Sequence, residues 1–278
     1  MKLERQPCRI GVLIRFSNSE TTLPDVISAL TQQTYQAEEI LGITNGSSDD
    51  SRQILTESGA RVVDWKAPYH HSKVLNSGLS ELQTDLVFVL SSHTVLKDRD
   101  TLKSLAKTFD DSRVACASLR WDTDPYYSDE IDWDEMEEKG LRFGSIYSNS
   151  MGMIRRSFWC ETPFDESVHT AEDYAWALEQ LRRGNLCRRL DLPFSYQRTG
   201  SGRDRAFAEV VFRLSSRYQL PVAWLGPANS LKLLLIQSTR QDDDHAAVRD
   251  RLLSWLDHRL REFFGPSSSL PNQKSQVT

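Results

Sequence analysis

The sequence lacks three features that would assign it to a simple class. Its four cysteines, at positions 8, 116, 160 and 187, do not have the paired spacing of zinc motifs, so we expect reduced thiols rather than a metal site or a disulfide framework. No apolar stretch approaches the roughly 18 residues that span a bilayer. The net charge of −5 argues against nucleic acid as a partner, because phosphate neutralisation needs a basic surface.

The first residues also lack the pattern of a secretory signal. Residues 1–16 carry charges, contain no small-residue cleavage site and have only a short apolar run, which is not typical of a signal peptide. We therefore expect a cytoplasmic protein, with the inner face of the membrane as the alternative location.

What the sequence does contain is an alternation of two patterns over the first 120 residues. Short apolar runs predict strands, and apolar residues at helical spacing predict helices. The strands are expected at 9–16, 38–44, 60–65, 85–90 and 113–121, and the helices at 23–33, 52–59, 72–82 and 101–110. Strands that are apolar on both faces indicate an α/β protein with a mainly parallel central sheet flanked by helices.

Polar residues follow several of these strands at their carboxyl ends. In such sheets ligands bind in the crevice beyond the carboxyl ends of the strands. The segments Phe16 to Asn18, Thr44 to Ser47 and Ser91 to His93 should therefore surround one ligand crevice.

The pattern changes after residue 121. Residues 122–144 are acidic and aromatic without clear periodicity, and we expect either a solvated surface loop or a flap over a polar ligand. A strand that leads into a short helix is predicted over 148–159, and an amphipathic helix over 171–184. Residues 203–264 read as helices, and the polar end, 265–278, is expected to be disordered.

Four segments, in this order, resemble family-2 glycosyltransferases. The opening segment has "QQTY" and "NGSSDDS" where the family has "QTY" and "DDGSxD". The segment "SKVLNSGL" is similar to the family's "K-x-x-A-L-N-x-G", and "PFDESVHTAEDYAWALEQLRRG" resembles a stretch of bacterial rhamnosyltransferase-like members. The resemblance covers roughly residues 9–200.

The resemblance implies a GT-A (Rossmann-like) fold and an inverting transfer of sugar to an acceptor hydroxyl in bacterial surface-polysaccharide synthesis. The implied domain spans 8–200, with a nucleotide-binding half at 8–121 and an acceptor half at 122–200, and 201–264 forms a C-terminal helical extension. The implied donor is a UDP-, dTDP- or GDP-sugar, and the acceptor is a glycan or a lipid-linked sugar. The C-terminal helices, through Val248, Leu252, Trp255, Leu256 and Phe263, are expected to dock on the domain or on a second subunit.

The resemblance also assigns roles to individual residues. Asp173 of "AED" is the implied general base, with Glu172 beside it; the alternative is that both acids only complement the dipole of their helix. The implied nucleotide-binding residues are Phe16, Asn18, Thr44, Asn45, Lys73, Ser91, Ser92 and Arg198.

The sequence departs from the family at the residues that hold a divalent metal. The usual Asp-x-Asp is Ser91, Ser92 and His93 here. Imidazole binds Mn²⁺ better than Mg²⁺, which prefers oxygen, so His93 is the expected metal ligand, with hydrogen bonding at the strand tip as its alternative role. Two further hypotheses stay open: metal-independent transfer, with arginines such as Arg198 neutralising the diphosphate, and a degenerate domain that binds nucleotide, glycan or a protein partner without catalysis.

Overall fold

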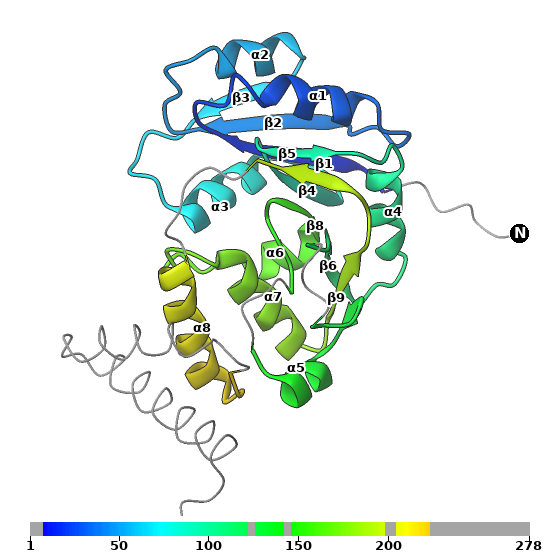
Figure 1. Cartoon of the computed structure of the whole chain (residues 1–278), viewed down its shortest axis with the longest axis vertical. Coiled ribbons are helices and arrows are strands. Elements are labelled where there is room, and N and C mark those ends of the chain that lie inside the picture. The colour runs from blue at the N-terminus through cyan, green and yellow to red at the C-terminus, as the bar shows by residue number, and fades with distance from the viewer. Residues whose placement is uncertain (1–7, 122–125, 142–145, 198–203, 223–278) are drawn as a thin grey trace, which may run out of the picture.

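An eight-stranded sheet forms the centre of the part of the chain that the structure describes (Figure 1). The structure is a computed structural model and describes residues 8–121, 126–141, 146–197 and 204–222. The strands of this sheet are β1 (Ile10–Phe16), β2 (Glu39–Thr44), β3 (Arg61–Asp64), β4 (Leu86–Ser91), β6 (Val114–Leu119), β7 (Glu130–Ile131), β8 (Met151–Arg155) and β9 (Leu186–Leu190).

The sheet is mainly parallel, as predicted. Its order is β3-β2-β1-β4-β8-β6-β9-β7. Strands β1 to β4 run in one direction, and β6 and β9 share it, whereas β8 is antiparallel to β4 and β6 and β7 is antiparallel to β9. The predicted strands and helices of residues 9–121 are confirmed, with shifts of at most two residues at their ends.

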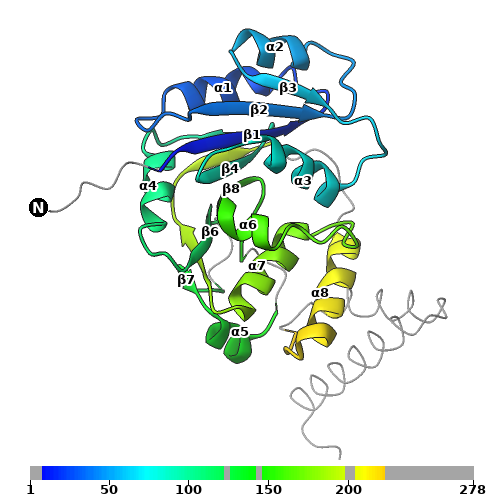
Figure 2. The same cartoon turned by 180° about the vertical axis from the view of Figure 1, so that it is seen from behind.

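Helices cover both faces of the sheet (Figures 1 and 2). On one face α1 (Leu23–Thr31), α2 (Ser51–Glu57) and α4 (Thr101–Thr108) bury their apolar residues in one core. On the other face α3 (His71–Glu81), α6 (Arg156–Glu161), α7 (Glu172–Arg182) and α8 (Asp204–Tyr218) build a second core. Along β1, Val12 and Ile14 belong to the first core and Leu13 to the second, because side chains alternate across a strand. Among the described residues, none of the helices has the length and apolar character that a bilayer crossing demands.

The prediction of a loop over 122–144 is wrong for residues 130–139, and the alternative of a flap over a polar ligand stays a prediction. Residues 130–131 form β7, and α5 (Trp133–Lys139) follows directly. Asp132 caps this helix, since its side chain accepts a hydrogen bond from the backbone N–H of Glu135. Ile131 and Met136 are fully buried in the second core. A capped helix and two core contacts therefore order a segment in which apolar periodicity is too short to detect.

A second, two-stranded sheet was also missed. It pairs β5 (Thr94–Leu96) with β10 (Phe194–Tyr196) in antiparallel register. Both strands have only three residues, so they carry too few alternations to be recognised in the sequence. The small sheet starts one residue after His93 and fixes the chain that leaves the tip of β4.

The helical prediction for 203–264 holds up to Tyr218, where α8 ends. The chain then turns, and Leu220 and Val222 pack into the second core, with Val222 bridged to Leu141. Residues 223–278, which include the predicted docking residues and the expected disordered tail, lie outside the described residues. The dimer through these helices stays a prediction.

Gly152 allows the turn at residues 147–150 to fold back onto β8. A Cβ atom at this position would lie 2.3 Å from the ring of Tyr147 and 2.4 Å from the carbonyl oxygen of Ser148. Such distances leave no room for a methyl group, and Tyr147 is itself buried. The turn presents Asn149 to the start of α7, where its backbone N–H donates to Asp173.

Gly152→Ala should lower the free energy of unfolding by about 1–3 kcal/mol or more, because the methyl group overpacks a backbone contact. The matched control is Ser118→Ala at the neighbouring register position on β6. The hydroxyl of Ser118 is buried without a hydrogen-bond partner among the described residues, so its removal should be neutral or stabilising. Urea unfolding of both variants measures the difference, and equal stability would show that the turn adjusts freely.

Candidate functional site

A pocket of about 390 Å³ lies at the carboxyl ends of β1, β2 and β4. It is lined by Arg15, Phe16, Ser17, Ile43, Asn45, Tyr69, His71, Val74, Ser91, Ser92, His93, Ser150 and Tyr196. The crevice that the three strand ends predicted is therefore present. It brings together five of the predicted ligand residues, namely Phe16, Asn45, Ser91, Ser92 and His93.

Hydrogen bonds hold the tip of β4 at the edge of this pocket. The hydroxyl of Ser92 is buried and lies 2.8 Å from the hydroxyl of Ser19, in the loop after β1. The backbone N–H of His93 donates to the hydroxyl of Ser91 at 3.3 Å, and its carbonyl accepts from the backbone N–H of Gln197 at 3.0 Å. The two serines thus tie the strand end to neighbouring loops, and His93 is fixed between β4 and the small sheet.

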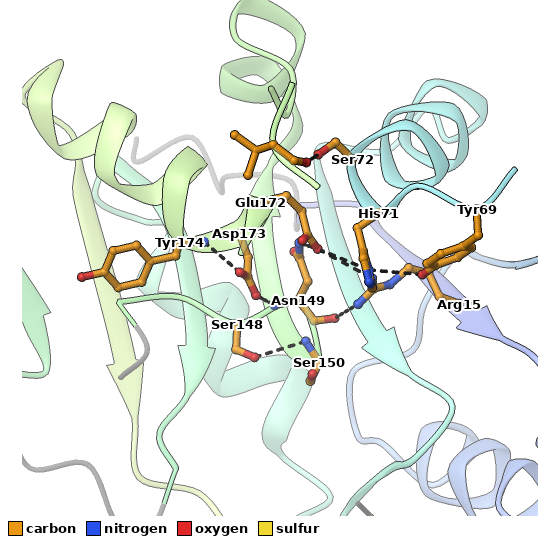
Figure 3. A network of polar contacts seen from close by, with 11 residues as sticks. Arg15, Tyr69, His71, Ser72, Ser148, Asn149, Ser150, Glu172, Asp173 and Tyr174 are labelled. Atoms are coloured by element: carbon orange, nitrogen blue, oxygen red, sulfur yellow. Dashed lines mark hydrogen bonds and ion pairs between the residues drawn. The ribbon is translucent and has the colours of Figure 1, made fainter. Parts of the chain in front are cut away.

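Arg15 is the register partner of Ser91 and lines the pocket, and Figure 3 shows it beside His71 and Glu172. Its Nη1 is 3.0 Å from Nδ1 of His71 and 3.7 Å from Oε1 of Glu172. Its Nη2 donates to the backbone carbonyl of Asn149 at 3.4 Å. Burial alone would lower the pKa of Arg15, but Tyr69 and Glu172 outweigh it and raise that pKa. The guanidinium is therefore a permanent buried cation.

Glu172 and Asp173 lie behind Arg15, at the start of α7 (Figure 3). Glu172 is buried, and its Oε1 also accepts from the side-chain amide of Asn149 at 3.4 Å. Asp173 accepts backbone hydrogen bonds at both oxygens, from Asn149 at 3.0 Å and from Tyr174 at 2.8 Å. The predicted acid pair is thus connected to the pocket through Arg15 and the turn at Asn149, although neither acid is among the lining residues.

The carboxyl group of Asp173 titrates near neutral pH. Burial and the neighbouring charge of Glu172 raise its pKa to about 7, and the hydrogen bonds from Asn149 and Tyr174 and the charge of Arg15 limit the rise. A general base works best when its pKa lies near the working pH. The carboxylate of Asp173 therefore has the proton affinity that a general base requires at neutral pH.

Four of the predicted binding residues lie away from the pocket lining or outside the described residues. Asn18 is exposed, and its side-chain oxygen accepts from the backbone N–H of Ser48 at 2.9 Å, so it fixes the loop after β2. Thr44 is buried with its hydroxyl 3.2 Å from that of Ser47. Lys73 is exposed on α3. Arg198 lies outside the described residues.

The sequence analysis missed Arg15, Tyr69, His71 and Tyr196 as lining residues. Arg15 had a detectable signal, because it is the one charged residue in the apolar run of residues 10–16. Tyr69 precedes α3 in a segment without periodicity, His71 is the first residue of α3, and Tyr196 lies on a three-residue strand. Their places follow from the tertiary structure alone.

The residues at the pocket do not fit a resident divalent cation. Across the described residues, no three His, Cys, Asp or Glu side chains come together as a metal site. The described residues that line the pocket include neither Asp nor Glu, whereas Mg²⁺ and Mn²⁺ are held mainly by carboxylate and other oxygen ligands. His93 as a metal ligand stays a prediction that this donor set does not support.

The chain is similar to one known protein family and to curated proteins with assigned activities. Residues 12–167 match the family described as glycosyl transferase family 2. The chain is 26% identical over 195 residues to the O-antigen chain rhamnosyltransferase RfbN of Salmonella typhimurium, covering 63% of this chain and 62% of that one. It is 25% identical over 173 residues to the O-antigen chain rhamnosyltransferase WbaN of Salmonella anatum, covering 56% and 55%. It thus spans less than two thirds of these relatives.

Solved structures share the fold at low sequence identity. The mannosyltransferase PcManGT from Pyrobaculum calidifontis, solved with GDP-Man and Mn²⁺, has a TM-score of 0.62 at 15% identity and matches 96% of this chain and 78% of its own. Glucosyl-3-phosphoglycerate synthase from Mycobacterium tuberculosis, solved with Mn²⁺, UDP-glucose and phosphoglyceric acid, has a TM-score of 0.61 at 16% identity, over 77% and 81%. These similarities show the predicted GT-A fold.

The raised pKa of Asp173 should appear in the pH dependence of stability. With a pKa of about 7 when folded and about 4 when unfolded, Asp173 binds more protons in the folded state between these values. The free energy of unfolding of the wild type should therefore fall, relative to Asp173→Asn, as the pH rises through this window, and stay level above it. The fall is at most about 4 kcal/mol.

Urea unfolding of both proteins at about pH 5 and about pH 8 measures this difference. Asp111→Asn is the control, because the hydrogen bonds of Arg113 lower the pKa of Asp111. The contribution of Asp111 to the pH dependence of the free energy of unfolding therefore lies at more acid pH. A stability difference between wild type and Asp173→Asn that is the same at both pH values would contradict the raised pKa.

Proposed function

Because the chain belongs to glycosyl transferase family 2, we propose that it transfers a sugar from a nucleotide-sugar donor to an acceptor hydroxyl with inversion at the anomeric carbon. The observation that carries this proposal is the pocket at the carboxyl ends of β1, β2 and β4, with an acid pair directly behind it. This placement offers a nucleotide site with a candidate base next to it, behind Arg15.

The relatives support a narrower form of the proposal. RfbN and WbaN are O-antigen chain rhamnosyltransferases, which supports a hexosyl or deoxyhexosyl donor and a glycan or lipid-linked acceptor in surface-polysaccharide synthesis. The donor nucleotide would be UDP, dTDP or GDP. Such an enzyme would act in the cytoplasm or at the inner face of the membrane, and it could pair with a second copy through its C-terminal helices.

In the proposed reaction Asp173 takes the proton of the acceptor hydroxyl. The acceptor oxygen then forms a bond to the anomeric carbon from the side opposite the nucleotide, and the bond from that carbon to the diphosphate oxygen breaks. The electron pair leaves with the nucleoside diphosphate, and the configuration is inverted. The backbone N–H of Asn149 orients the carboxylate of Asp173, and the ion pair with Arg15 holds Glu172 in place.

A divalent cation has no assigned step in this mechanism. Two of the similar structures were solved with Mn²⁺, but the described pocket residues here do not provide a matching donor set. The developing charge on the leaving diphosphate must still be neutralised by some cation.

A non-catalytic domain is the second candidate function. The observation that favours it is the lack of any Asp or Glu among the described residues of the pocket lining. Hydrolysis and transfer of UDP-, dTDP- and GDP-sugars, each with and without Mn²⁺, separate the two candidates. Turnover of any donor supports the enzyme, whereas binding without turnover supports the non-catalytic domain.

Asp173→Asn should lower the transfer rate by about 10²–10⁴-fold, the usual effect of losing a positioned general base. The affinity for the nucleoside diphosphate should stay unchanged, because the base acts on the acceptor. The measurements are steady-state transfer and calorimetric binding of the diphosphate.

Asp134→Asn is the matched control, since Asp134 is an exposed acid in the first turn of another helix, α5. It should keep full activity. If Asp173→Asn behaves like this control, the acid pair serves only the helix dipole and the proposed mechanism is wrong.

A further inference from the structure

Arg15 and the tip of β4 are neighbours on one face of the sheet. In the parallel register Arg15 is the partner of Ser91. Side chains of register partners in parallel strands point to the same face, and both residues line the pocket. Arg15 thus places a positive charge directly beside Ser91, the first residue of the triplet that ends in His93.

The described residues that line the pocket carry positive but no negative side-chain charge. Of the described residues that line it, Arg15 is the one Lys or Arg side chain, and there is no Asp or Glu. A nucleoside diphosphate that enters this pocket therefore meets one permanent cation and no lining carboxylate. A guanidinium is charged at any physiological pH, and its planar fork of N–H groups matches phosphate oxygens.

The side chain of Arg15 is held in place and keeps donors for a ligand. Its exposure is 15%, and contacts with His71, Glu172 and Asn149 occupy its two terminal nitrogens. Its Nε atom is buried without a hydrogen-bond partner among the described residues. Buried donors are almost always paired in native proteins, so this N–H can donate to an acceptor that the described residues do not supply, such as an oxygen of a bound ligand.

We propose that Arg15 binds the diphosphate of the donor, and that donor binding by this chain does not require a metal. This inference rests on the proposed function. His93 then acts as a polar residue in the pocket wall rather than as a metal ligand.

The test uses the full chain and calorimetric titration with UDP, dTDP and GDP, each in EDTA and in Mn²⁺. At least one diphosphate should bind equally well in both buffers. Arg15→Gln should weaken that binding by about 10–100-fold, the usual contribution of hydrogen bonds to a charged partner. Binding of the parent nucleoside should be unaffected, which a merely structural role for Arg15 does not predict. The diphosphate affinity of Arg15→Lys, which keeps the charge but not the planar fork of N–H groups, should lie between those of the wild type and Arg15→Gln.

Arg113→Gln is the control, since Arg113 is an exposed arginine that pairs with Asp111 at the start of β6. Thermal unfolding of each variant shows whether it is folded. Because removal of Arg15 leaves Glu172 without its cation, a second variant, Ser91→Asp, keeps the inference testable if Arg15→Gln does not fold. A carboxylate beside Arg15 should pair with it and weaken binding in EDTA at least about tenfold, and Mn²⁺ should restore it.

The outcomes separate this inference from the proposed function. If a diphosphate binds to the wild type only with Mn²⁺, or if Arg15→Gln or Ser91→Asp binds it in EDTA as the wild type does, the inference is overturned and the proposed function stands. If no diphosphate binds to the wild type in either buffer, the proposed function is overturned and the inference with it.

Discussion

The ion pair between Arg15 and Glu172 joins the two halves of the described structure. Arg15 comes from β1, in the parallel half of the sheet, and Glu172 begins α7, after the antiparallel strand β8. Both side chains are largely buried, with exposures of 15% and 6%. Removing charges from water is expensive, and a buried pair is seldom more stable than a well-packed apolar replacement. The pair is therefore better explained by the chemistry of the pocket than by folding stability.

Backbone hydrogen bonds near the ion pair offset part of the cost of burying these charged side chains. The turn before β8 lies close enough to the strand that only a glycine fits at position 152. This turn brings the carbonyl of Asn149 to Arg15 and the backbone N–H of Asn149 to Asp173. One short segment thus supplies an acceptor to the cation and a donor to an acid. The close packing at Gly152 thereby determines which backbone groups contact Arg15 and Asp173.

The sequence predicts this arrangement in part, and the limits have physical causes. The strands and helices of residues 9–121 can be predicted from the sequence. Strands with two buried faces are short continuous apolar runs, and helices have apolar residues at helical spacing. The strand ends then predict the crevice. Asn18 and Lys73 were assigned by motif position, but a motif does not fix the direction of a side chain, and both are exposed. The helix α5 was missed because tertiary contacts of Ile131 and Met136 order it. Arg15 was missed although it is the one charged residue of its apolar run, because the sequence does not show which side chains of other elements it meets.

The position of Arg15 between pocket and acids has a consequence for catalysis. The proton affinity of Asp173 results from burial and the charge of Glu172, which raise its pKa, and from two backbone hydrogen bonds and the charge of Arg15, which lower it. A diphosphate bound at Arg15 would add negative charge on the side of the pocket and offset part of the lowering effect. Asp173, the proposed base, would then hold a proton more tightly while the donor is in place, and release of the nucleoside diphosphate would reverse this change. One buried guanidinium would thus link the charge of the leaving group to the proton affinity of the base, although the two sites share no direct contact.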